Sequence, residues 1–157
     1  MSIIIEEIKA ISNLDLMPKQ KKFYLDLLEV AKPVEVVSIK EVFDKIDISL
    51  IKKAINPRKK ECYKNAHLLS TLFPDVKYCE GKANFSFSGL HNINFDHAFN
   101  LVGDKYIDIT VELALKEFGK YQYVLFGEYS LEEIERVSEI TGYYGEYFKH
   151  IYLENLL

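Results

Sequence analysis

The chain has 157 residues, of which 48% are hydrophobic and 28% are charged. This length and composition are typical of one globular domain with a hydrophobic core, and they exclude an intrinsically disordered chain. The formal net charge of −4 argues against nucleic acid or an anionic membrane surface as an obligate partner.

The chain has two cysteines, Cys62 and Cys79, which is too few for the disulfide framework of a small secreted domain. We therefore expect both to be reduced thiols. The first residues lack the basic segment of a signal peptide, and no apolar run approaches the roughly 20 residues that cross a bilayer. These observations predict a cytoplasmic protein without a membrane segment. They leave open an export route that uses no leader peptide.

The first 55 residues are predicted to form a helical N-terminal segment. Three helices are expected there, over residues 3–12, 18–32 and 38–46. In the second helix the apolar side chains recur at helical spacing, and Pro33 ends it. Ser38 and Glu41 form a capping box that begins the third helix.

A core region of helix and sheet is predicted over residues 56–129, followed by C-terminal helices over 130–157. The expected elements are a helix over 60–73, strands over 76–87, 94–102 and 105–109, a short helix over 111–118 and a strand over 121–129. Ser130 and Glu133 form a second capping box that begins a helix to about Ile140. Helices, then an antiparallel meander, then helices are typical of a single α+β domain.

A thiol, an imidazole and a carboxylate follow one another within the predicted core, at Cys62, His97 and Asp108. In enzymes with a cysteine nucleophile, the imidazole takes the proton of the thiol and the carboxylate orients the imidazole. Cys62 is expected in the first turn of its helix, where the backbone dipole favours a thiolate. The three residues predict an enzyme that acts on amide or ester carbonyls.

The turn at Gly103 and Asp104 predicts how His97 and Asp108 meet. If these two residues form a type II′ turn, Val102 pairs with Lys105. Asp108 then lies on the same face of the hairpin as His97, as a diagonal neighbour. A shift by one residue would place the two side chains on opposite faces.

Other polar residues offer rival roles. His67 could be the base, but five residues along a helix rotate it by about 140° from Cys62. Asn56 could lend its amide to an oxyanion hole, although a residue before a proline is more often part of a turn. A zinc site of Cys62, Cys79, His67 and His97 has suitable ligand types but matches no compact zinc motif, so we predict no metal and no cofactor.

The cysteine-bearing helix, His-Ala-Phe-Asn (97–100) and Tyr-Ile-Asp-Ile-Thr (106–110) resemble the transglutaminase-like branch of the papain-like cysteine enzymes. Tyr-Cys-Glu-Gly (78–81) is similar to the strand that this family has between its cysteine and its histidine. In the family the cysteine opens a helix, and the histidine and aspartate lie on adjacent antiparallel strands.

The resemblance covers roughly residues 56–112. It implies that Cys62 is the nucleophile, His97 the base and Asp108 the orienting carboxylate. Two positions depart from the family pattern: Phe99 stands in place of the usual tryptophan after the histidine, and Glu61 replaces the glycine that commonly precedes the cysteine.

Together these residues predict a cofactor-independent peptidase, isopeptidase, amidase or acyl transferase with a protein or peptide substrate. The alternative is a catalytically inactive transglutaminase-like module that binds protein. A third hypothesis is a metal-binding or regulatory protein.

Overall fold

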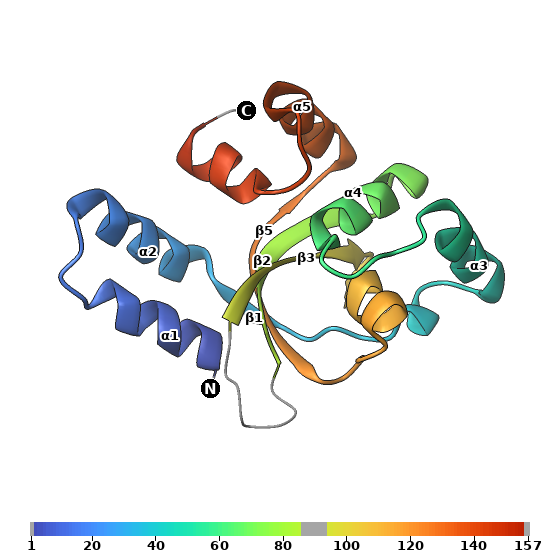
Figure 1. Cartoon of the computed structure of the whole chain (residues 1–157), viewed down its shortest axis with the longest axis horizontal. Coiled ribbons are helices and arrows are strands. Elements are labelled where there is room, and N and C mark those ends of the chain that lie inside the picture. Colours follow the sequence, from blue (N-terminus) through green and yellow to red (C-terminus); the bar gives the residue numbers. More distant parts are fainter. Residues whose placement is uncertain (1, 86–93, 156–157) are drawn as a thin grey trace.

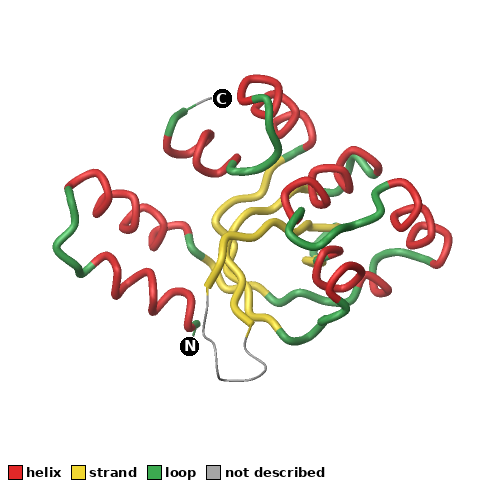
Figure 2. Tube along the Cα trace, viewed as in Figure 1, coloured by secondary structure: helices red, strands yellow, loops and turns green. Residues whose placement is uncertain are grey.

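The computed structural model describes residues 2–85 and 94–155, where helices surround a curled antiparallel sheet (Figures 1 and 2). The elements are α1 (Ile3–Ser12), α2 (Pro18–Val30), β1 (Lys32–Val34), the 3₁₀ turn η1 (Ile39–Glu41), α3 (Lys45–Ala54), α4 (Cys62–Leu72), β2 (Lys77–Phe85), β3 (Asn94–Val102), β4 (Lys105–Ile107), the π-helix η2 (Thr110–Leu115), β5 (Tyr121–Tyr129), α5 (Leu131–Thr141) and the π-helix η3 (Lys149–Leu153). The predicted α+β class is confirmed.

The sheet has the strand order β1-β5-β2-β3-β4, and every neighbouring pair is antiparallel. One face packs against α1, α2, α4 and α5, with Tyr78, Ala98 and Val124 at the centre of this core. The other face holds a smaller cluster of buried side chains, among them Phe99 and Tyr123. Since neighbouring residues of a strand point to opposite faces, β2, β3 and β5 each contribute to both clusters.

Several elements form as the sequence predicts. β3 and β5 have the predicted bounds, and the capping box of Ser130 and Glu133 begins α5. β2 ends at Phe85, and the last two residues of the predicted strand lie outside the described ranges. The hairpin turn is also confirmed, because Val102 pairs with Lys105 and Gly103 has the positive φ of +62° that this turn needs.

The N-terminal segment is not wholly helical, which corrects the prediction. Pro33 does end α2, but it then lies in β1, which pairs with β5. β1 is an edge strand of the sheet, where a residue without a backbone N–H is tolerated.

The helix expected over 38–46 is also wrong. Only the turn η1 follows Ser38, and the helix of this region is α3, capped by Asp44. Ser38 donates its hydroxyl hydrogen to Glu112 at 2.7 Å, and the same carboxylate accepts from the Ile39 N–H at 2.9 Å. Glu112 therefore supplies the capping carboxylate that the prediction assigned to Glu41. Folding brings Glu112 to this turn from a distant segment of the chain.

A bulge in the central strand pair depends on Gly81. The β2–β5 register shifts between Glu80 and Gly81, and a Cβ atom at Gly81 would lie 1.8 Å from the backbone oxygen of Val124. Glycine is thus required here because the two backbones approach closely. Within residues 2–85 and 94–155, none of the helices combines the length and hydropathy that a membrane crossing needs.

Candidate active site

Cys62 lies in the first turn of α4, as predicted, although the helix begins at Cys62 itself and not at Lys60, and the residue is partly buried. The helix lies against β3, where Asn100 donates its amide hydrogens to the backbone oxygens of Ala66 (3.0 Å) and Lys77 (3.2 Å). These bonds give Asn100 a structural role. They also hold α4, and with it Cys62, over the strand that carries His97.

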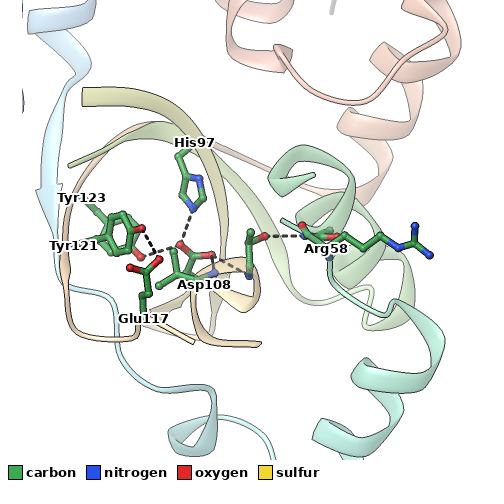
Figure 3. Close-up of polar contacts among 9 residues, drawn as sticks. Arg58, His97, Asp108, Glu117, Tyr121 and Tyr123 are labelled. Carbon is green, nitrogen blue, oxygen red and sulfur yellow. Dashed lines mark hydrogen bonds and ion pairs between the residues drawn. The ribbon is translucent and has the colours of Figure 1, made fainter. Parts of the chain in front are cut away.

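His97 and Asp108 are in direct contact. The His97 Nε2–H donates to Asp108 Oδ2 at 2.6 Å, and both residues are buried (Figure 3). β4 pairs only with Asn100–Val102 of β3, so the chain has left the sheet when it reaches Asp108. Asp108 does lie beside His97, as the turn predicted, but the strand expected over 105–109 ends at Ile107, so Asp108 reaches the imidazole from outside the sheet.

Asp108 accepts four hydrogen bonds. Its Oδ2 accepts from His97 and, at 2.8 Å, from the hydroxyl of Tyr123 (Figure 3). Its Oδ1 accepts from the backbone N–H groups of Thr110 and Val111, each at 3.1 Å. The residue thus caps the first turn of η2 and orients His97 at the same time, and the cap holds the carboxylate in place.

The surroundings of His97 favour its charged form. Burial alone would lower the pKa of its imidazolium, but the Asp108 carboxylate and a hydrogen bond and charge from Cys62 outweigh burial and raise the pKa of His97 to about 10. Because Nε2 is bound to Asp108, Nδ1 is the ring nitrogen left for Cys62. His97 is thus hydrogen-bonded to Asp108, and Cys62 lies close enough to act on the pKa of its imidazole.

Asn65 ties the two ends of this site together. Its amide donates to the backbone oxygen of Arg58 and to Thr110 Oγ1, both at 2.9 Å. It joins the loop before Cys62 to the segment that follows Asp108. The bonds of Asn65 connect distant segments and have no local signal in the sequence.

Tyr123 was not predicted as part of the site. It comes from β5, and its only sequence signal is its place in the alternating Tyr-Gln-Tyr-Val-Leu pattern of that strand. Its hydroxyl donates to the Asp108 carboxylate (Figure 3). Of the residues predicted for the site, only His97 also donates to this carboxylate.

We expect Tyr123→Phe to lower the free energy of unfolding by about 1.5–3 kcal/mol, the usual value of a buried hydrogen bond to a charged group. Urea denaturation measures this change. Tyr121→Phe is the matched control, because Tyr121 donates instead to the less buried Glu117 at 3.2 Å. Equal losses in the two variants would contradict a special role for the Tyr123 bond.

The remaining candidates lie elsewhere. His67 Nδ1 is 2.7 Å from the hydroxyl of Tyr147, and burial lowers the pKa of His67 to about 4, so it is not the partner of Cys62. Asn56 is exposed and has a left-handed φ of +51° after the end of α3, which favours its turn role over an oxyanion role.

The four zinc ligands considered above are not gathered. Cys79 is buried in the cluster on the second face of the sheet, and His67 contacts Tyr147. Within the described part of the chain, no three His, Cys, Asp or Glu side chains are grouped so that they could hold a metal ion.

Comparison with known proteins adds no relative: no family model, no curated protein and no solved structure matches this chain significantly.

Proposed function

We propose that the protein is a cysteine-nucleophile enzyme of the transglutaminase-like, papain-like kind that acts on amide bonds. The observation that carries this proposal is the buried His97–Asp108 pair, 2.6 Å apart, together with the place of Cys62 at the start of α4, where its thiol helps to raise the pKa of His97. The fold assignment rests on the arrangement of a cysteine-bearing helix against an antiparallel sheet, with histidine and aspartate supplied by one hairpin.

In the proposed reaction, the Cys62 thiolate attacks the carbonyl carbon of the substrate while His97 carries the proton. The free N–H groups in the first turn of α4 are suited to stabilise the negative charge that forms on the carbonyl oxygen. Collapse of the tetrahedral intermediate breaks the C–N bond, and His97 gives its proton to the departing amine. The acyl group is left as a thioester on Cys62.

Water or a second amine then resolves the thioester. His97, now neutral, takes a proton from the attacking molecule, and the thiolate leaves as the new C–O or C–N bond forms. With water the product is a carboxylic acid, and with an amine it is a new amide. Asp108 keeps the imidazole in the tautomer and orientation that both steps need.

An acylation experiment tests the proposal. Incubation with p-nitrophenyl acetate should release a burst of p-nitrophenolate and leave one acetyl group on Cys62, located by mass spectrometry. Cys79 is an internal control, since burial raises the pKa of its thiol and it should stay unmodified. Addition of methylamine distinguishes transfer from hydrolysis, because a transferase would form N-methylacetamide. Absence of a burst, with Cys62 no more reactive than in His97→Ala, would favour the inactive binding module.

A further inference from the structure

The positive charge of the chain is concentrated in one segment. Residues 45–60, from the start of α3 to the loop before Cys62, hold six of the 20 cationic residues and one of the 24 acidic residues. The segment therefore has a formal charge of +5 and, because the whole chain has −4, the rest of the chain has −9. The six cations are Lys45, Lys52, Lys53, Arg58, Lys59 and Lys60. An acidic partner is thus attracted to this segment and repelled by the rest of the protein.

All six cations are exposed to solvent. Within residues 2–85 and 94–155, none of them forms a salt bridge, whereas lysines elsewhere do, such as Lys22 with Asp26 at 2.7 Å. The Arg58 side chain extends away from Asp108 (Figure 3). The carboxylates of a partner can therefore bind these cations without breaking an ion pair of the protein.

α3 adds apolar side chains to this charge. The helix lies at the periphery of the fold (Figure 1), and a hollow of about 390 Å³ lies along it. Ile46 and Leu50 line the hollow one helical turn apart, and they are 78% and 43% exposed. Lys45 and Lys53 flank them along the helix and line the hollow as well. An apolar centre with a cationic rim suits a chain that carries both apolar and acidic side chains.

We infer that residues 45–60 bind an acidic segment of a partner protein, and that apolar side chains of this segment enter the hollow on α3. Residues 45–60 include no aromatic side chain on which a nucleic-acid base could stack. Two exposed large apolar side chains are also too few for a helix that lies on a bilayer. Both observations favour a protein over a nucleic acid or a membrane.

The inference goes beyond the proposed function, because this binding does not involve the thiol. The two surfaces are nevertheless close along the chain. Lys60 lies two residues before Cys62, and the backbone oxygen of Arg58 accepts from the Asn65 amide of α4 at 2.9 Å. A protein docked on residues 45–60 is therefore held near the start of α4.

Fluorescence anisotropy tests the inference with a fluorescein-labelled peptide of three Glu-Glu-Leu-Leu repeats. Two matched probes have every Leu replaced by Ser, or every Glu replaced by Gln. The Glu/Leu probe should bind at least about tenfold more tightly than either, since it alone offers both the charge and the apolar side chains. Its affinity should fall as the salt concentration rises, because exposed charges are screened.

Lys45→Glu combined with Lys53→Glu should weaken binding of the Glu/Leu probe at least about tenfold, since two attractive charges become repulsive. Lys19→Glu combined with Lys21→Glu is the matched control. These two lysines are exposed on α2, and their replacement changes the net charge by the same amount. Circular dichroism checks that both double variants are folded.

Leu50→Ser tests the apolar part of the surface. It should weaken binding of the Glu/Leu probe and leave the weak binding of the Glu/Ser probe unchanged. Leu25→Ser is its control, because Leu25 is exposed to a similar extent (48%) but lies on α2.

Several outcomes would overturn the inference. These are no binding of the Glu/Leu probe, or equal weakening by the two pairs of lysine substitutions. Tighter binding of oligo(dT) or of phosphatidylserine vesicles would assign the surface to a nucleic acid or a membrane instead. A dimer that only the Lys45 and Lys53 substitutions dissociate would assign it to a second copy of the chain. Cys62→Ala should bind the probe as the wild type does, so the result is independent of the proposed nucleophile.

Discussion

Replacement of Asp108 by alanine is expected to lower the rate of Cys62 acylation about 10⁴-fold, as loss of the orienting carboxylate does in a serine–histidine–aspartate triad. The variant should also lose about 3–5 kcal/mol of unfolding free energy, since a buried charged partner of His97 and the cap of η2 disappear together. Aryl-ester burst kinetics and urea denaturation measure the two effects.

Asp108→Asn separates orientation from capping. Its amide oxygen can still accept from the backbone N–H groups of Thr110 and Val111, so more stability should remain than in the alanine variant. The amide nitrogen would face two donors, His97 Nε2–H and the Tyr123 hydroxyl, so the acylation rate should stay low. Wild-type acylation in either variant would contradict the role given to Asp108.

Gly81→Ala is expected to lower the free energy of unfolding more than Gly119→Ala, the other glycine-to-alanine change. The new Cβ would lie 1.8 Å from the backbone oxygen of Val124, so β2 and β5 must separate at the bulge. We expect a loss of about 3 kcal/mol or more, above the usual cost of overpacking, because backbone atoms cannot move aside as side chains do. Urea denaturation, or failure to obtain folded protein, reports the effect.

Gly119→Ala is the matched control for this prediction. Gly119 has a φ of +87°, but no atom lies within 4 Å of a Cβ built there, so only backbone strain is added. That strain should cost about 1 kcal/mol. If the two variants lose the same stability, the close approach of β2 and β5 at Gly81 is not what demands glycine.

The part of the site that could be predicted depends on local patterns. The predicted turn and the pairing of Val102 with Lys105 bring Asp108 back to His97 within 11 residues, with β4 ending one residue before Asp108. The helix phase likewise separates His67 from Cys62 without any knowledge of the fold. Each of these predictions depends on a helical repeat or a turn, which involves only one or two neighbouring secondary-structure elements.

What the sequence did not predict comes from segments that are distant along the chain. Tyr123 reaches Asp108 from β5, and Glu112 takes over the cap at Ser38 across more than 70 residues. β1 forms only because β5 offers it an edge. Strand pairing and long-range caps are decided by tertiary contacts, which local propensity cannot indicate.

The central claim, that Cys62 and His97 act as a thiolate–imidazolium pair, is tested most directly by the pH dependence of Cys62 alkylation. Iodoacetamide labelling of Cys62 should be fast at neutral pH, where His97 is charged because Asp108 and Cys62 outweigh burial and raise its pKa to about 10, and this fast reaction should be lost in His97→Ala. Cys79 should stay unlabelled in the folded protein, since it is buried. An ordinary thiol profile at Cys62, unchanged by His97→Ala, would contradict the account.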